Sequence, residues 1–319
     1  MKMNLNRIAR ETGYALSTVS RALNDSPKVA EKTKREILAY ANRFGYKKER
    51  KSIAILVPAW NFEDLYFRET VHELIAEASC QGYEVIILPD NSLSFLENYN
   101  LAAAFSLISL SGIESWWDKR YTFPLIGLNV KSNLLDNIYS VLSDDRQGIE
   151  LLVTHLTNLG HKRIAYIGSG FLQPAHFENN LRFQAFQEKM RNLTLRDDLY
   201  MDTHGRDEEL FFGIHRLLEE KPTAFLCACE QLPQKVIYHL YSAGYRVPDD
   251  FSVTGIVMPG FDQYCLPPIT GIQQNLPMLA RQAIGLFHQL LQGRPIKQNI
   301  LIPYQFCSRL STAPYRKKL

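Results

Sequence analysis

The stretch that decides the N-terminal fold is Thr12-Gly-Tyr-Ala-Leu-Ser-Thr-Val-Ser-Arg-Ala-Leu-Asn24. The segment before it predicts a short helix, because three apolar residues recur there at helical spacing: Leu5, Ile8 and Ala9. Gly13 supplies the backbone freedom that a tight turn needs. A second helix is expected from Leu16 to Leu23. Two short helices joined by a glycine-containing turn form a helix-turn-helix, whose second helix fits the major groove of DNA.

The expected second helix has an apolar side and a polar side. Its inward residues are Val19, Ala22 and Leu23, and its outward residues are Ser17, Ser20 and Arg21. Arginine can form two hydrogen bonds with a guanine edge, and hydroxyls can bond phosphates or base edges. The outward side therefore suits a DNA groove. From the residues alone, an ordinary helical hairpin with a polar side is the alternative.

The run Thr18-Val-Ser-Arg-Ala-Leu-Asn24, followed by Val29, Thr33 and Gly45-Tyr46, resembles the DNA-binding head of the lactose-repressor (LacI/GalR) family. A third helix is expected from about residue 30 to 44, where Thr33, Ile37, Leu38 and Ala41 recur at helical spacing. The resemblance implies that the first, second and sixth residues of the recognition helix choose the operator; these are Leu16, Ser17 and Arg21. The positions that match phosphate contacts are Asn4, Thr18, Ser20, Asn24 and Lys28.

Charge is distributed unevenly along the 319 residues. The whole chain has a formal net charge of +3, but residues 1–51 hold 13 Lys and Arg against 5 Asp and Glu, and the remainder holds 23 against 28. A basic head on an acidic body fits a nucleic-acid-binding module joined to a soluble domain, with a merely solvated basic surface as the alternative.

Cysteine spacing and apolar runs argue against several other classes. The five cysteines have no spacing typical of a disulfide framework or a zinc site. Cys227 and Cys229 lie in an apolar run, so buried thiols on a strand are expected, with metal binding as the alternative. No stretch approaches the roughly 18 apolar residues of a membrane helix.

Beyond residue 52, strand and helix patterns alternate. Apolar runs predict strands at residues 53–57, 85–88, 104–109, 125–128, 164–167, 224–229, 252–256 and 300–303. Helical spacing predicts helices at residues 67–81, 146–159, 181–191, 234–243 and 279–291. This alternation indicates an α/β fold with a doubly wound parallel sheet covered by helices.

The body resembles the same family in Asp144-Asp145, Leu159-Gly-His161, Arg163-Ile-Ala-Tyr-Ile-Gly168, Val247-Pro248 and Ser311-Thr-Ala-Pro314. The resemblance implies the two-lobed fold of periplasmic sugar-binding proteins, with three crossovers. One lobe would combine residues 53–143 with about 274–300, and the other 144–273 with the last strand. Three parts are therefore expected: a helix-turn-helix head at 1–46, a short basic linker at 47–52, and a two-lobed effector-binding and dimerisation domain at 53–319.

The linker departs from the family, which has a longer segment there that folds into a hinge helix on DNA. Residues 47–52 make fewer than two helical turns. None of them is an apolar wedge of the kind that unstacks a base step. The sequence therefore predicts no hinge helix and little bending of the operator centre.

The resemblance also implies a sugar-like effector between the lobes. The matching positions are Tyr66, Phe67, Asn129, Arg182, Cys229 and Val257. Tyr66 and Phe67 would pack on a sugar face, with plain core aromatics as the alternative. Arg182 would hold ligand hydroxyls or a carboxylate, with a surface arginine as the alternative. Cys229 and Val257 replace the family's usual asparagine and aspartate, so weaker binding of an ordinary hexose is expected.

Together these features predict a dimeric cytoplasmic transcription regulator, a repressor of a carbohydrate-utilisation operon, that binds double-stranded operator DNA of pseudo-palindromic sequence and uses no cofactor or metal. Control by a protein corepressor or by an unusual non-sugar effector is the alternative within the family. A solute-binding protein is disfavoured by the basic head and by a polar start unlike a signal peptide. An enzyme is disfavoured because the sequence has no nucleophile elbow, phosphate loop or metal-ligand spacing.

Overall fold

A computed structural model describes residues 5–23, 26, 28–43, 52–59, 64–110, 113–114, 117, 120–121, 123–132, 138–172, 177–293 and 297–316. The chain divides into two compact units, Met1–Lys51 and Ser52–Leu319. Each unit has its own hydrophobic core. The two units are therefore described separately.

The described residues of the first unit form three helices: α1 (Leu5–Thr12), α2 (Leu16–Leu23) and α3 (Glu31–Arg43). Their apolar sides meet in a buried cluster of Ile8, Val19, Ala22, Val29, Ile37 and Ala41. Gly13 lies between α1 and α2 with φ of 74°, in the left-handed region that glycine adopts without steric cost. The predicted helix-turn-helix is therefore present. Asn4, Asn24 and the linker residues 47–51 lie outside the described residues.

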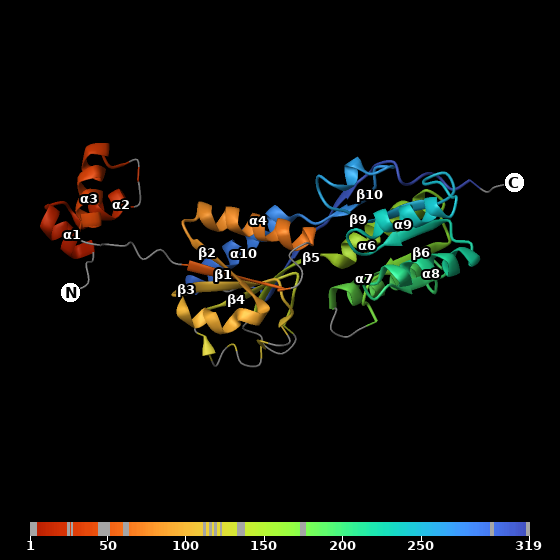
Figure 1. Cartoon of the computed structure of the whole chain (residues 1–319), viewed down its shortest axis with the longest axis horizontal. Coiled ribbons are helices and arrows are strands. Elements are labelled where there is room, and N and C mark those ends of the chain that lie inside the picture. Colours follow the sequence, from red (N-terminus) through yellow and green to blue (C-terminus); the bar gives the residue numbers. More distant parts are fainter. Residues whose placement is uncertain are drawn as a thin grey trace. The chain divides into compact units, whose positions relative to one another are not determined.

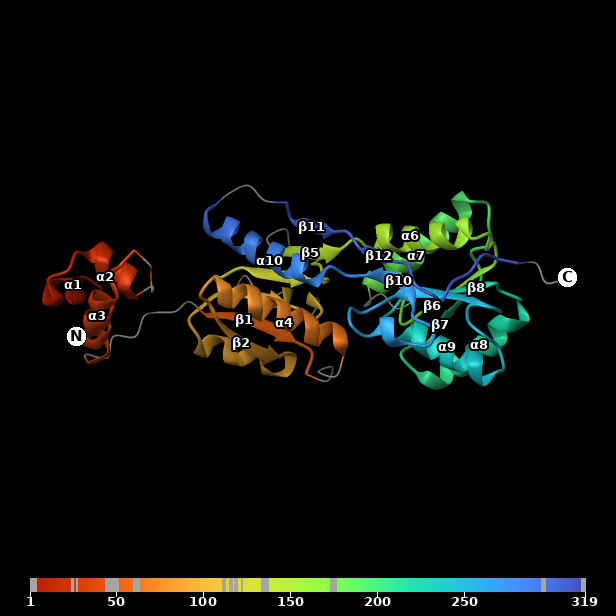
Figure 2. The same cartoon turned by 90° about the horizontal axis from the view of Figure 1, so that it is seen from above.

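The second unit contains two sheets, each with six strands among the described residues (Figures 1 and 2). The first sheet is parallel throughout, in the order β11 (Asn299–Ile302), β5 (Tyr139–Ser143), β4 (Leu125–Leu128), β3 (Leu101–Ser106), β1 (Ser52–Val57) and β2 (Glu84–Pro89). The order in the second sheet is β12 (Gln305–Cys307), β10 (Thr270–Gln273), β9 (Ser252–Ile256), β8 (Ala224–Cys227), β6 (Ile164–Gly168) and β7 (Tyr200–Asp202). Here β12 pairs antiparallel with β10, and the other pairs are parallel.

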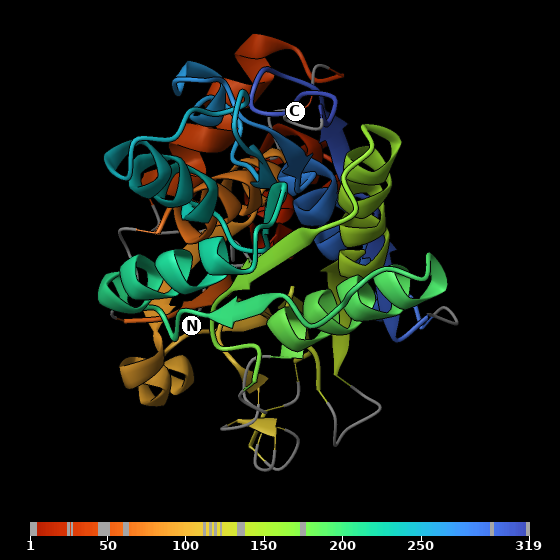
Figure 3. The ribbon, with the colours of Figure 1, turned by 90° about the vertical axis from the view of Figure 1, so that its right-hand side faces the viewer.

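Helices cover both faces of each sheet. On the first sheet, α4 (Leu65–Cys80) and α10 (Leu276–Leu291) share one buried cluster, and the 3₁₀-helix η1 (Asp90–Asn98) contributes Leu96 to another. On the second sheet, α6 (Asp145–Asn158) and α7 (Phe177–Asn192) cover one face, and α8 (Asp207–Glu219) and α9 (Leu232–Ser242) cover the other (Figure 3). A 3₁₀ turn, η3 (Asp262–Tyr264), precedes β10. The doubly wound α/β architecture is confirmed in both lobes.

The chain passes three times between the lobes: from β5 into α6, from β10 into α10, and from β11 into β12. One detail of the predicted division is wrong. The last predicted strand, residues 300–303, was assigned to the second lobe, but β11 pairs with β5 of the first sheet, with Ile300 opposite Val141. A further strand, β12, then returns to the second sheet beside β10.

Candidate DNA-binding surface and interlobe site

The recognition helix α2 presents its expected side to solvent. Ser17 and Arg21 are exposed and Leu16 is 47% exposed, whereas Thr18 and Ser20 are half-buried. Lys28, in the segment after α2, is also exposed. A cation, a hydroxyl and a leucine therefore lie together on one face of the helix, with groups suited to base edges and phosphates.

The turn before α2 is fastened to its neighbours by side-chain hydrogen bonds. The Thr12 hydroxyl donates to the Ile8 carbonyl over 2.6 Å, and the Tyr14 hydroxyl donates to Glu36 Oε2 on α3 over 2.5 Å. The bond to Glu36 raises the pKa of Tyr14, so its hydroxyl keeps its proton near neutral pH. The bond from Thr12 stabilises the end of α1, and the bond from Tyr14 joins the turn before α2 to α3. Tyr14 and Glu36 were not predicted from the sequence to have this role.

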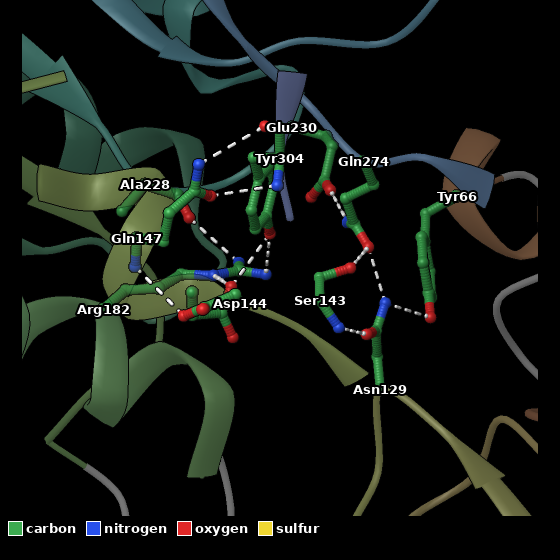
Figure 4. Close-up of polar contacts among 11 residues, drawn as sticks. Tyr66, Asn129, Ser143, Asp144, Gln147, Arg182, Ala228, Glu230, Gln274 and Tyr304 are labelled. Carbon is green, nitrogen blue, oxygen red and sulfur yellow. Dashed lines mark hydrogen bonds and ion pairs between the residues drawn. The ribbon is translucent and has the colours of Figure 1, made fainter. Parts of the chain in front are cut away.

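In the second unit, polar side chains gather where parallel strands end. Asn129 directly follows β4 and has a positive φ of 53°, a conformation that asparagine tolerates better than most residues. Its Oδ1 accepts from the Ser143 backbone N–H over 2.6 Å, and its Nδ2 donates to the Tyr66 hydroxyl over 2.9 Å (Figure 4). These contacts tie the ends of β4 and β5 to the start of α4.

Gln274 continues this hydrogen-bond chain from the first lobe into the second. The side chain lies in the second crossover and is 5% exposed. Its Oε1 accepts from Asn129 Nδ2 over 2.5 Å and from the Ser143 hydroxyl over 2.8 Å. Its Nε2 donates to Glu230 Oε1, just beyond β8, over 2.8 Å. We call the chain Tyr66–Asn129–Gln274–Glu230 the interlobe relay (Figure 4).

Arg182 lies beside the relay on α7 and is 7% exposed. Its Nε donates to Asp145 Oδ1 over 2.7 Å, its Nη1 to the Ala228 carbonyl over 3.0 Å, and its Nη2 to the Tyr304 hydroxyl over 3.3 Å (Figure 4). Tyr304 in turn donates to Asp145 Oδ1 over 2.8 Å. Arg182 therefore closes a buried ion pair that joins α6, α7 and the third crossover.

The charges in this region are set by burial. Burial acts to lower the pKa of Arg182, but Asp145 and Tyr304 outweigh it, so the pKa lies well above its usual value. Burial raises the pKa of the Cys229 thiol to about 11, which keeps it neutral at physiological pH. Burial also raises the pKa of Tyr304 well above the ordinary value. The region thus presents neutral hydroxyl, thiol and amide groups, together with the Glu230 side chain, around one compensated cation.

The structure brings some predicted effector residues together and separates others. Tyr66 and Asn129 share the relay, and Arg182 and Cys229 interact electrostatically at the end of β8. Phe67 packs against the first lobe's core, with its ring centroid 5.2 Å from that of Tyr66. Val257 is 1% exposed inside the core between β9 and the α8–α9 layer. Their assignment to an effector site therefore remains a prediction.

Sequence reasoning missed five residues of this region: Ser143, Asp145, Glu230, Gln274 and Tyr304. Each lies at or near the carboxyl end of a strand, and such ends are where open α/β sheets bind ligands. That position was the available signal. No group of three or more His, Cys, Asp or Glu suited to a metal ion occurs among the described residues. None of the described helices is long and apolar enough to cross a membrane.

Comparison with known proteins finds a matching family model for each unit. Residues 4–49 match the family described as bacterial regulatory proteins, lacI family, and residues 153–312 match the periplasmic binding protein-like domain. The HTH-type transcriptional repressor PurR of Mannheimia succiniciproducens is 24% identical over 92% of this chain and 93% of its own length. The HTH-type transcriptional regulator GanR of Bacillus subtilis is 27% identical over 90% and 92%. The crystal structure of the lac repressor dimer bound to operator and the anti-inducer ONPF has the same fold, with a TM-score of 0.75, 20% identity, and coverage of 98% of this chain and 100% of that one.

Proposed function

Because the chain belongs to the lacI family of bacterial regulatory proteins, we propose that it represses transcription by binding a pseudo-palindromic operator as a homodimer, under the control of a small-molecule effector bound between the lobes. The observation that carries the DNA-binding part is the exposed side of α2. Its Ser17 and Arg21 project from a folded helix-turn-helix whose other side is buried.

Two substitutions separate base discrimination from phosphate attraction. Arg21→Ala should weaken specific binding by about 1–3 kcal/mol per half-site and flatten the preference at one base pair, because arginine can fork onto a guanine edge. Lys28→Ala should weaken binding to all sequences alike, since a phosphate contact carries no base information. Selection of binding sites from a random DNA pool, followed by gel shift, measures both effects. An Arg21→Ala protein with the full wild-type sequence preference would contradict our placement of the recognition helix.

The proposed homodimer is supported by an apolar surface on the second lobe. Phe211 and Phe212 on α8 are 43% and 70% exposed, and Tyr238 and Tyr241 on α9 are 67% and 43% exposed. The ring of Phe211 lies 5.6 Å from that of His239, so the surface is continuous across both helices. Contiguous exposed aromatic groups of this kind mark association sites. We call these four residues the α8–α9 surface.

The proposed effector site is supported by the interlobe relay. Hydrogen bonds among Tyr66, Asn129, Gln274 and Glu230 join groups from both lobes, so a ligand that exchanged hydrogen bonds with them would change how the lobes are held. A ligand that binds two arrangements unequally shifts the population between them. We propose a carbohydrate effector and, with it, regulated genes for carbohydrate use.

A thermal-shift panel of sugars and sugar phosphates, run with and without operator DNA, tests the effector proposal. An effector should raise the melting temperature of the protein and change its operator affinity in the same concentration range. A panel in which every sugar leaves operator affinity unchanged would argue for a protein corepressor or a non-sugar effector.

A further inference from the structure

Tyr166 is a buried tyrosine whose hydroxyl has no hydrogen-bond partner. The residue lies in the middle of β6, is 0% exposed, and no described residue offers its Oη a partner. Three rings surround its own, with centroid distances of 5.3 Å to Phe171, 5.2 Å to Phe183 and 5.1 Å to Phe186. A hydroxyl buried in this way carries a free-energy penalty that a phenylalanine would not.

The hydroxyl lies toward the ligand-facing end of the sheet. A Cβ built on Gly168 would be 3.0 Å from Tyr166 Cε1, so the ring extends along β6 toward the strand's carboxyl end. Burial raises the pKa of Tyr166, and the next contributions come from Cys229 and Arg182, which lie near the hydroxyl. The adjacent strand β8 ends at Cys227, opposite Ile167, and leads into Ala228 and Cys229. The unpaired hydroxyl therefore extends toward the same end of the sheet as Ala228, whose carbonyl accepts from Arg182.

The charges nearby exclude an anionic partner for this hydroxyl. The guanidinium of Arg182 is compensated by Asp145 at 2.7 Å and also donates to Ala228 and Tyr304. Asp202 adds a second carboxylate, which accepts from the backbone N–H groups of Gly170 over 2.6 Å and Leu172 over 3.2 Å. A phosphate or carboxylate would therefore meet like charges, whereas a hydroxyl or carbonyl oxygen would not.

We propose that the Tyr166 hydroxyl is a specificity-determining contact, which pairs with an uncharged oxygen of the effector at the carboxyl ends of β6 and β8. The inference rests on the proposed effector function and adds to it one residue and one ligand class. A ligand oxygen that satisfies a buried, unpaired hydroxyl removes a penalty already present in the free protein. Such a pairing distinguishes hydroxylated ligands from analogues that lack that oxygen.

Tyr166→Phe and Tyr304→Phe in the full-length protein form a matched pair for the test. Both remove one buried phenolic oxygen, but the Tyr304 oxygen is bonded to Asp145 and Arg182, whereas the Tyr166 oxygen is unpaired. Without ligand, Tyr166→Phe should melt at or above the wild-type temperature, and Tyr304→Phe should melt below it. A fall in Tyr166→Phe as large as that in Tyr304→Phe would overturn the proposal, because the hydroxyl would then have a structural partner.

The ligand arm uses D-ribose, D-glucose and cellobiose as uncharged probes and glucose 6-phosphate and glucuronate as anionic probes. At least one uncharged probe should raise the wild-type melting temperature, and Tyr166→Phe should need at least tenfold more of it for the same shift. Equal concentration dependence in the two proteins, a response to anions alone, or no response to any uncharged probe would each overturn the inference.

Gel shift on operator DNA separates this failure from failure of the proposed function. If a probe changes operator affinity equally in wild type and Tyr166→Phe, the effector function stands and the role of Tyr166 falls. If wild type does not bind an operator selected from a random pool, the proposed function itself fails.

Discussion

At the scale of single residues, Arg182 has a structural role that the sequence did not predict. Its three donor nitrogens each lie within hydrogen-bonding distance of a protein acceptor, and its side chain is 8% exposed. The sequence favoured an arginine that holds the ligand. The structure gives it a structural partner, Asp145, which is itself 9% exposed. A ligand that used Arg182 would have to share it with this ion pair.

The stability of Arg182 variants tests whether the ion pair with Asp145 supports the fold. Arg182→Ala leaves the Asp145 carboxylate buried and unpaired, which should lower the free energy of unfolding by about 3–5 kcal/mol. The double variant Arg182→Met with Asp145→Asn removes both charges and should recover most of that loss. Urea denaturation of wild type and both variants measures it. A single variant as stable as wild type would show that the ion pair does not support the fold.

At the scale of elements, His161 fastens the C-terminal segment to the second sheet. The ring is 3% exposed, and Nε2 lies 2.9 Å from the Ser252 hydroxyl on β9 and 3.0 Å from the Ala313 carbonyl. Nδ1 lies 3.0 Å from the Thr223 hydroxyl. A carbonyl oxygen can only accept, so the neutral ring carries its proton on Nε2 and accepts at Nδ1. Protonation of Nδ1 would remove that acceptor.

The buried ring makes stability depend on pH. Burial lowers the pKa of His161, while in the unfolded chain the imidazole titrates near its ordinary value of about 6.5. The unfolded state therefore takes up a proton first as pH falls, so the stabilisation is complete above about pH 6.5 and decreases below it. Burial lowers the pKa of His155 as well, which acts in the same direction. We expect the free energy of unfolding from urea titrations to fall between about pH 7 and pH 5.

A matched pair of variants tests whether His161 causes this change in the free energy of unfolding with pH. His161→Gln removes one of the buried rings and should reduce the pH dependence, whereas His72→Gln should not, because the His72 ring is 73% exposed on α4. A wild-type protein whose stability is constant from pH 7 to pH 5 would contradict the expectation.

Elements with regular apolar patterns could be predicted, and those shaped by distant contacts could not. The strands at 125–128 and 252–256 have the predicted bounds because their residues are buried on both faces. β5 was missed because Ser140 and Ser143 are buried polar residues within it. α8 was missed because Gly213 interrupts its pattern, and only the structure shows that Met201 of β7 occupies the space of a side chain there.

In the candidate site, too, some residues could be predicted from the sequence and their partners could not. Asn129 and Arg182 could be located from family positions, but their partners Gln274 and Asp145 are 145 and 37 residues away in sequence. No local pattern specifies such pairs, because they arise when separate crossovers meet between the lobes. The exposed side of α2, by contrast, follows from helical spacing alone; it was predicted correctly for Ser17 and Arg21, whereas Ser20 is half-buried.

At the scale of the whole molecule, the α8–α9 surface should control dimerisation. Phe212→Glu places a charge on the most exposed ring of this surface, so it should weaken self-association by at least tenfold, because a buried unpaired carboxylate is costly. Sedimentation equilibrium measures the dissociation constant. Phe95→Glu is the matched control, since Phe95 is 53% exposed on η1 of the first lobe. If both variants associate as wild type does, the dimer uses another face.

The linker sets how the head of the proposed dimer acts on DNA. Residues 47–52 lack an apolar wedge and, fully extended, span at most about 20 Å. If no hinge helix forms, as we predict, the effector's influence on the head acts through the spacing of the two linkers rather than through a kinked operator centre. Circular-permutation gel shift should therefore show little bending. A large bend, or a complex structure with an ordered helix inserted from residues 47–52, would contradict this.

The same linker should instead contribute sequence-independent attraction. The linker contains four cations, Lys47, Lys48, Arg50 and Lys51, which we expect to contact DNA phosphates. Each phosphate contact adds about 0.9 to the slope of log affinity against log salt. Replacing Lys47 and Lys48 by serine should lower that slope equally for operator and random DNA, because released counterions carry no sequence information. Glu49→Gln, which removes a negative charge from the same segment, should not lower it. A loss confined to operator DNA would mean that the linker contacts bases, and a slope unchanged by the double substitution would mean that it does not reach the phosphates.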